Sequence, residues 1–291
     1  MTDRDHSGEA TSSSEFAAFE DPRSFLSRHG LRPKDSFGQN FLVAPPVAES
    51  IVRAVDPRPD ECVIEVGTGP GTIAKMLAPR ARRVIAIERD RDMVAALRAD
   101  ELAPNIEVLE MDAAQFDYSA HASSEPTALV GNLPYQITGK LIRAFLAPPV
   151  RWRVAVVMVQ KEVALRLAAK PNDDDWGVLS VFTQAACTVE RVCEASPRCF
   201  HPAPRVVSAV VALRPRAVPL AEETPLFQRV VHGLFAARRK TTLNALTPVS
   251  PNGREGAKAA LERVKIDGQR RPETLSIEEL RALSDALVAV P

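Results

Sequence analysis

A glycine-rich turn at residues 65–72 is the first segment of the sequence that could hold a ligand. It reads Glu-Val-Gly-Thr-Gly-Pro-Gly-Thr, with glycines at positions 67, 69 and 71. Glycine adopts positive φ angles and has no Cβ, so the backbone of such a turn can lie directly against a ligand. A helix that begins just after the turn offers free backbone N–H groups to the same ligand. Because position 72 is Thr, the turn lacks the complete G-x-G-x-x-G pattern of dinucleotide-binding proteins.

Two acidic residues follow the next two apolar runs of the chain. Glu88 lies about 20 residues after Gly67, where a carboxylate can accept hydrogen bonds from both hydroxyl groups of a ribose. Asp112 follows the third run, where it could hold the amino group of an adenine or cap a helix. This arrangement suits a dinucleotide and S-adenosyl-L-methionine equally, because both bind at the carboxyl ends of parallel strands.

A second chemical signal is the segment Asn132-Leu133-Pro134-Tyr135, which follows a fourth apolar run. Asn132 offers an amide oxygen, and a residue before proline is held extended, which directs the Leu133 carbonyl. Two such acceptors can grip both N–H bonds of one exocyclic amine. An adenine N6 lone pair is delocalised into the ring, and this grip favours the pyramidal form that attacks a sulfonium methyl group.

Tyr135 adds a flat ring on which a base can stack. A paired adenine cannot present its N6 atom, so the target must be unpaired or flipped out of a helix. The segment from Asn132 to Tyr135 therefore favours S-adenosyl-L-methionine over a dinucleotide, and it indicates methylation of an adenine amine.

These motifs must be positioned by the apolar runs that precede them. Short β-branched runs alternate with longer helical stretches over the first half of the chain. We expect strands at 62–66, 83–87, 106–109, 128–130 and 154–159, and helices at 47–55, 72–77, 93–102 and 137–146. Such alternation predicts βαβ units in a mostly parallel sheet with helices on both faces. The fold class is therefore α/β and Rossmann-like, with the motifs together at one edge of the sheet.

The pattern changes after residue 178. A helix at 178–186 precedes two strands at 187–192 and 206–213, which predict an antiparallel edge added to the sheet. A proline-rich linker at 214–219 is followed only by helical segments, at 227–236, 258–264 and 276–289. We therefore expect a solvated N-terminal tail (1–22), an α/β catalytic domain (23–216) and a small, locally basic helical domain (217–291).

Composition excludes several classes of protein. The chain has 291 residues, of which 45% are hydrophobic, and its 37 Lys and Arg balance 37 Asp and Glu. It has no apolar run long enough to span a membrane, and its polar, acidic start lacks the features of a secretory signal. We expect a cytoplasmic protein without a membrane partner. The spacing of the four cysteines matches no metal or redox motif, so we expect no metal.

Taken together, the motifs resemble KsgA-type ribosomal RNA small-subunit adenine dimethyltransferases, over about residues 31–246. The segment 37–42, Phe-Gly-Gln-Asn-Phe-Leu, matches the opening motif of that family. The resemblance implies that S-adenosyl-L-methionine is bound by Asn40, Leu42, Gly67, Gly69, Glu88, Asp112 and Asn132. It also implies that the catalytic residues are Asn132, Leu133, Pro134, Tyr135 and Phe200.

Phe200 opens a segment that resembles the family's F-x-P-x-P-x-V motif, whose aromatic ring faces the target base opposite the tyrosine. The family implies dimethylation of two adjacent adenines near the 3′ end of 16S rRNA, with a role in ribosome assembly. We expect a monomer whose partner is the small ribosomal subunit.

The best candidates for contacts with RNA phosphates are Arg238, Arg239 and Lys240, which match the family's basic motif; a solvated helix end is their alternative explanation. Residues 160–162 either touch RNA or only begin a helix.

Three other functions remain open: a 23S rRNA methyltransferase of the macrolide-resistance type, a mainly non-catalytic ribosome-assembly factor, and a nicotinamide-dependent oxidoreductase. The incomplete glycine pattern disfavours the oxidoreductase.

Overall fold

The computed structural model describes residues 18–147 and 151–288. Its main sheet has the strand order β4-β3-β2-β5-β6-β9-β7, in which the first five strands are parallel and the last two are antiparallel to their neighbours. The strands are β2 (Cys62–Val66), β3 (Arg83–Glu88), β4 (Ile106–Glu110), β5 (Thr127–Asn132), β6 (Ala155–Gln160), β7 (Cys187–Ala195) and β9 (Ser208–Pro215). The predicted Rossmann-like sheet with an antiparallel edge is confirmed.

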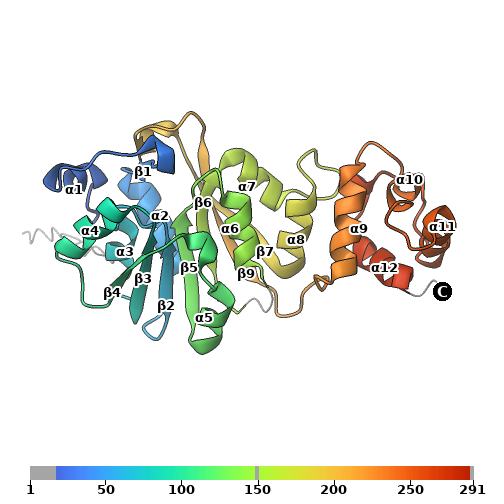
Figure 1. Cartoon of the computed structure of the whole chain (residues 1–291), viewed down its shortest axis with the longest axis horizontal. Coiled ribbons are helices and arrows are strands. Elements are labelled where there is room, and N and C mark those ends of the chain that lie inside the picture. Colours follow the sequence, from blue (N-terminus) through green and yellow to red (C-terminus); the bar gives the residue numbers. More distant parts are fainter. Residues whose placement is uncertain (1–17, 148–150, 289–291) are drawn as a thin grey trace, which may run out of the picture.

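Helices cover both faces of this sheet (Figure 1). One face packs against α5 (Tyr118–Ser124), α6 (Thr138–Phe145) and α7 (Lys161–Ala168), and the other packs against α2 (Pro45–Val55) and α3 (Thr72–Leu77). Alternate residues of each strand supply the two cores: Ile64 faces the first group of helices and Val63 faces the second. Helix α4 (Arg91–Ala99) completes the outer end of the sheet.

The strand order reverses between β2 and β5, because the chain runs outward from β2 through β3 to β4 and then returns to the other side of β2. A crevice opens at the carboxyl ends of the strands at such a reversal, and ligands of α/β proteins bind there. The glycine turn follows β2 and the segment from Asn132 to Tyr135 follows β5, so the reversal brings both motifs to the same crevice.

A small second sheet lies at the same edge. It pairs β1 (Phe41–Leu42) antiparallel with β8 (Phe200–His201), with Leu42 opposite Phe200. The pairing places the opening motif beside the segment that begins at Phe200, although about 160 residues separate them in sequence. The sequence patterns predict neither of these two-residue strands.

The chain before residue 45 is tied to the α/β domain. Residues 1–17 of the expected tail lie outside the described residues. Phe19 packs against the core around α2, Glu20 forms an ion pair with Lys75 of α3 (2.5 Å), and α1 (Pro22–Arg28) follows, capped by Asp21. The last part of the segment expected as a tail is therefore packed against the domain.

The last four helices lie at the opposite end of the molecule (Figure 1). They are α9 (Pro225–Ala236), α10 (Thr242–Leu246), α11 (Gly253–Arg263) and α12 (Ile277–Val288). Their core is shared with Trp176 and with Val181 and Phe182 of α8 (Val178–Ala186), and the Trp176 indole N–H donates to the Leu275 carbonyl (3.2 Å). Helix α8 therefore joins the two parts of the chain. Within the described residues, no helix is both long and apolar enough for a membrane span.

Candidate functional site

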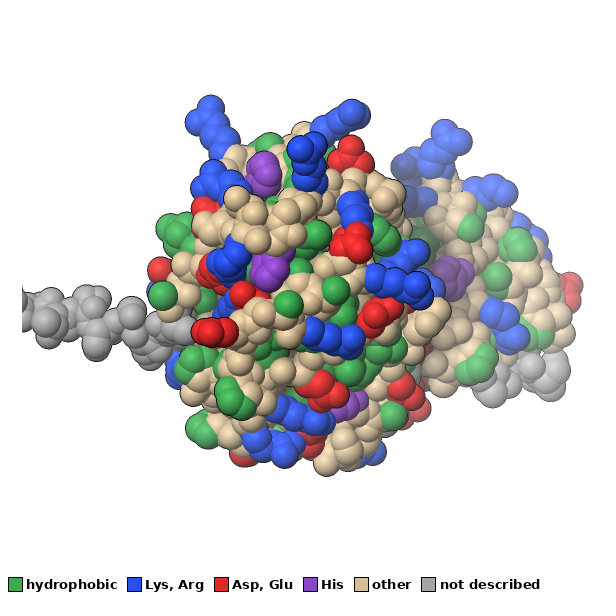
Figure 2. All heavy atoms as spheres, turned by 60° about the vertical axis from the view of Figure 1, so that its left-hand side comes forward, with side chains coloured by type: hydrophobic (Ala, Val, Ile, Leu, Met, Phe, Trp, Pro, Cys, Tyr) green, Lys and Arg blue, Asp and Glu red, His purple; other side chains and the backbone are tan. Residues whose placement is uncertain are grey.

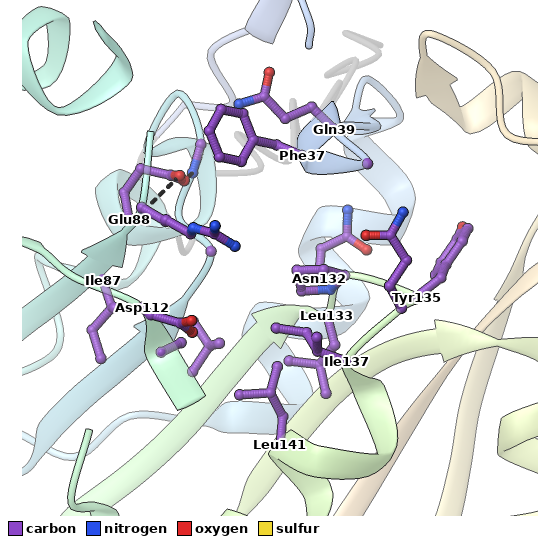
Figure 3. Close-up of a pocket in the computed structure, with 18 of the residues that line it drawn as sticks. Phe37, Gln39, Ile87, Glu88, Asp112, Asn132, Leu133, Tyr135, Ile137 and Leu141 are labelled. Atoms are coloured by element: carbon purple, nitrogen blue, oxygen red, sulfur yellow. Dashed lines mark hydrogen bonds between the residues drawn. The ribbon is translucent and has the colours of Figure 1, made fainter. Parts of the chain in front are cut away.

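A cavity open to solvent lies at the strand reversal (Figure 3). Five separate segments of the chain line it: residues 36–41, the glycine turn, the ends of β3 and β4, and the segment that follows β5. The predicted site residues that line it are Asn40, Gly67, Gly69, Glu88, Asp112, Asn132, Leu133, Pro134 and Tyr135. The fold thus gathers most of the residues that sequence reasoning selected.

The glycine turn requires glycine for two reasons. Gly67 and Gly69 have φ angles of 69° and 52°, which side-chain-bearing residues rarely adopt. A Cβ on Gly69 would also lie 2.8 Å from the ring of Phe41 in β1. The turn is therefore packed closely against the opening motif, and its backbone forms one wall of the cavity.

Glu88 is held in place by the backbone. One carboxylate oxygen accepts the N–H of Gly69 (2.9 Å), and the other accepts the N–H groups of Arg89 and Asp90 (2.8 Å each). Burial raises the pKa of this carboxyl, and the three N–H donors act against that rise. The side chain bridges the turn and the end of β3 at the position predicted for a ribose contact (Figure 3).

Asp112 caps a helix and also lines the cavity, and its contact with adenine stays a prediction. Its Oδ1 accepts the N–H of Ala114 (2.9 Å) and so caps the short helix at Ala113–Gln115. Its side chain also lines the cavity beside Ile87, on the same side as Glu88 (Figure 3). A capped carboxylate is fixed in direction, which suits the recognition of an adenine amino group.

The amide of Asn132 is oriented by the opening motif. Its Nδ2 donates to the backbone carbonyl of Asn40 (2.8 Å), which leaves Oδ1 as a hydrogen-bond acceptor. Leu133 donates its own N–H to the Met158 carbonyl (3.0 Å), and none of the described backbone groups donates to the Leu133 carbonyl oxygen. Asn132 Oδ1 and the Leu133 carbonyl oxygen therefore both lack a described donor at the end of β5, and their grip on one amine stays a prediction.

Tyr135 lies on the side of the cavity away from Glu88 (Figure 3), and its hydroxyl is 2.8 Å from the Ser208 hydroxyl.

Phe200 is placed differently from the residues above. It is only 4% exposed, packs in the core on the α2 side of the sheet and does not line the cavity, because β8 is paired with β1. Its stacking role stays a prediction. Leu42, which is also buried, lines a smaller pocket behind the glycine turn.

Sequence reasoning missed the residues that hold the opening motif over the cavity. Lys34 forms an ion pair with Asp90 (2.6 Å), and the side-chain amide of Gln39 donates to the same carboxylate (2.9 Å). Although burial opposes ionisation, the hydrogen bonds from Lys34 and Gln39 lower the pKa of Asp90. Gln39 belongs to the 37–42 motif, but nothing in the sequence indicates that its partner is Asp90.

The basic motif at the end of α9 divides into two kinds of residue. Arg238 forms an ion pair with Glu273 (2.7 Å) and donates to the carbonyl of Asp173 (3.2 Å), so it holds the end of α9 to the neighbouring loops. Arg239 and Lys240 are exposed, and neither forms an ion pair with any described residue. At the other candidate segment, α7 begins at Lys161.

One cluster of side chains outside the cavity has ligand atoms close enough together to hold a metal. Ligand atoms of Cys62, His121 and Glu125 lie within 4.8 Å of one another at the opposite edge of the sheet. Glu125 is already paired with Arg82 and Arg83, whose positive charges oppose binding of a further cation. All four cysteines are free thiols.

A Rossmann-like sheet with a glycine turn after β2 and a buried carboxylate at the end of β3 is typical of S-adenosylmethionine-dependent methyltransferases. The particular family follows from sequence comparison: residues 30–287 match the family described as ribosomal RNA adenine dimethylase. The chain therefore belongs to this family, and S-adenosylmethionine is its methyl donor. This membership excludes the nicotinamide-dependent oxidoreductase.

Named relatives span nearly the whole chain. A Myxococcus xanthus (strain DK1622) protein named ribosomal RNA small subunit methyltransferase A is 41% identical over 271 residues, which cover 92% of this chain and 95% of that protein. A protein of the same name from Anaeromyxobacter sp. (strain K) is 42% identical over 280 residues, with coverage of 91% and 97%.

Two solved structures share the fold. A dimethyladenosine transferase from Plasmodium falciparum has a TM-score of 0.75 at 23% identity, and the match covers 84% of this chain and 95% of that one. The 23S rRNA methyltransferase ErmE has a TM-score of 0.65 at 29% identity, and the match covers 86% of this chain and 100% of that one.

Proposed function

We propose that this protein dimethylates the N6 amines of two adjacent adenines near the 3′ end of 16S rRNA in the small ribosomal subunit, in the cytoplasm. The orientation of Asn132 carries the chemical part of the proposal: its Nδ2 is bound to the Asn40 carbonyl, so Oδ1 is presented as an acceptor beside the Leu133 carbonyl. The choice of subunit is supported by the relatives named for the small subunit, which are 41% and 42% identical, whereas ErmE is 29% identical.

In the proposed reaction, the Asn132 amide oxygen and the Leu133 carbonyl oxygen accept hydrogen bonds from the two N–H groups of the target amine. These hydrogen bonds favour the pyramidal form of the amine. This interaction is strongest in the transition state, so it raises the rate of transfer rather than only the affinity. S-adenosylmethionine supplies an electrophilic methyl group, and Glu88 and Asp112 are the residues that fit its ribose and adenine. The methylated amine is a strong acid, so the site needs no general base of high pKa to remove its proton.

The geometry of the site supports this arrangement. Glu88 and Asp112 lie on one side of the cavity, whereas Asn132 and Tyr135 lie on the other (Figure 3). A cofactor on the first side and a flipped-out adenine against Tyr135 would meet near Asn132. Fixing both reactants on opposite walls supplies much of the alignment that methyl transfer requires.

The surface charges fit a limited contact with RNA. Figure 2 shows basic and acidic side chains interspersed over one face, with several Lys and Arg protruding from its upper edge, where β1 lies in Figure 1. We propose that Arg239 and Lys240 add phosphate contacts on the C-terminal helices. Replacing either by Ala should reduce the slope of log affinity against log salt by about 1, because each phosphate contact releases counterions.

Methyl transfer to separated ribosomal subunits tests the proposed target. Tritiated methyl groups should enter undermodified small subunits, and nucleoside analysis should yield N6,N6-dimethyladenosine. Asn132→Ala should reduce this transfer by at least about 100-fold, the scale observed when one oriented transition-state contact is removed. Asn244→Ala, the same change on the exposed side of α10, is the matched control and should transfer at the wild-type rate. Label confined to the large subunit would overturn the choice of 16S rRNA.

A further inference from the structure

The Tyr135 side chain is anchored to a residue far from it in sequence. Its hydroxyl lies 2.8 Å from the hydroxyl of Ser208, the first residue of β9. In the sheet, β6 separates β5 from β9. The tyrosine therefore extends from the loop after β5 across the end of β6 to reach its partner, and it lies on the side of the cavity away from Glu88 (Figure 3).

Ser208 is a rigid anchor. It is fully buried, and its strand is paired on both sides, with Ser208 opposite Gln160 of β6 and opposite Ala195 of β7. Burial and strand pairing on both sides fix the backbone that carries this side chain. A hydrogen bond to such a residue fixes the far end of the tyrosine ring relative to the sheet.

The Ser208 hydroxyl has no other partner among the described residues. A buried hydroxyl that lacks a hydrogen bond is unfavourable, so the hydrogen bond with Tyr135 satisfies the Ser208 hydroxyl as well as holding the tyrosine. The strand position alone does not require a hydroxyl group, because the flanking residues of β9 are Ala and Val. The Ser208 hydroxyl therefore contributes a hydrogen bond to Tyr135 and is not required for strand pairing.

We propose that Ser208 is a positioning residue for methyl transfer, which holds the Tyr135 ring in the plane against which the target adenine stacks. The proposal rests on the proposed position of the target base beside Tyr135. A ring that is already fixed loses no side-chain entropy when RNA binds, and it keeps the amine aligned with Asn132. Ser208 itself touches neither the cofactor cavity nor the base.

Kinetics of methyl transfer test the coupling between the two residues. Ser208→Ala should lower kcat/KM for undermodified small subunits by about two- to tenfold, the effect of immobilising one side chain, without changing cofactor affinity in calorimetry. Tyr135→Phe removes the other half of the hydrogen bond. In the double variant, Ser208→Ala should cause no further loss, because it acts only through the tyrosine hydroxyl. Losses that multiply in the double variant would overturn the proposal.

Two further variants separate positioning from stability. Ser180→Ala removes another fully buried hydroxyl, one that donates to the Arg166 carbonyl in the region of α8, and should leave kcat/KM unchanged. Ser208→Thr keeps the hydroxyl and should retain most of the activity. Equal losses in Ser208→Thr and Ser208→Ala would show that packing at this position, and not the hydrogen bond, matters.

The hydrogen bond between the Tyr135 and Ser208 hydroxyls can also be detected in the absence of RNA. The chain has only two tyrosines, and the second, Tyr118, donates to the Ala113 carbonyl (2.7 Å). In protein labelled with 13C at the tyrosine Cζ atoms, Ser208→Ala should shift the Tyr135 resonance and leave that of Tyr118 in place. An unchanged Tyr135 resonance would contradict the proposal even if methyl transfer to 16S rRNA is confirmed. A wild-type protein that transfers no methyl group to small subunits would instead contradict only the proposed function.

Discussion

We predict that replacing Glu65 by Gln makes the protein more stable at alkaline pH and removes a large part of its pH dependence. Glu65 lies on the central strand β2 and is only 4% exposed. Its carboxyl accepts a hydrogen bond from the Thr68 hydroxyl, within the glycine turn. No basic side chain forms an ion pair with it among the described residues, so only hydrogen bonds offset the cost of burying its charge.

Burial raises the pKa of Glu65 from 4.5 to about 8, although the hydrogen bonds from Thr68 and the Ala74 backbone act in the opposite direction. The folded protein therefore binds this proton more tightly than the unfolded chain does. The associated stability is fully present below pH 4.5 and is lost as the pH rises to about 8. At about 1.4 kcal/mol per pH unit, the loss over this interval is at most about 5 kcal/mol.

Urea unfolding at several pH values between 5 and 9 measures this effect as the difference between wild type and Glu65→Gln. Subtracting the two curves cancels the contributions of the other titrating groups. The variant should gain several kcal/mol relative to wild type across this range, nearly all of it below pH 8. Glu101→Gln makes the same chemical change at an exposed position and is the matched control. A difference for Glu65→Gln that does not vary with pH would refute the reasoning.

Two other substitutions test the residues around the site. Gly131→Ala would place a Cβ 2.6 Å from the Val66 carbonyl oxygen of the neighbouring strand, so we expect a loss of about 1–3 kcal/mol in the free energy of unfolding, measured with urea. Unchanged stability would mean that β2 and β5 can separate freely at this point. Glu88→Gln leaves backbone N–H groups without a charged acceptor and should weaken cofactor binding by about 10- to 100-fold in calorimetry. Wild-type affinity in this variant would remove Glu88 from the ribose site.

The parallel part of the sheet was predictable because four of its five strands, β2, β3, β5 and β6, are buried on both faces, whereas the edge strand β4 is only partly buried. Such strands read as continuous apolar runs, and the expected bounds of β2 and of α3 and α8 are those of the structure. The missed elements are short or polar. Helix α5 has the sequence Tyr-Ser-Ala-His-Ala-Ser-Ser, in which only Tyr118 and Ala122 are buried, so its pattern gives little helical signal.

Within the site, the chemistry of Gly67, Glu88 and Asn132 was readable because local sequence places each at the carboxyl end of a strand. Their partners were not readable. The amide of Asn132 is oriented by Asn40, and Asp90 is bound by Gln39, across separations of 92 and 51 residues. Contacts over such distances depend on how the chain returns past the sheet, which one sequence does not encode as a local pattern.

Local sequence patterns were enough to predict the fold class, the cofactor and a set of candidate reacting groups, because strand periodicity, glycine turns and the proline after Leu133 act over a few neighbouring residues. The partners of these groups depend on the folded chain. The fold tied Arg238 to Glu273, buried Phe200 in the core on the α2 side of the sheet and joined Tyr135 to Ser208. The physical reason is that hydrogen bonds and burial join groups that the folded chain brings together, and those neighbours are set by the packing of the whole sheet.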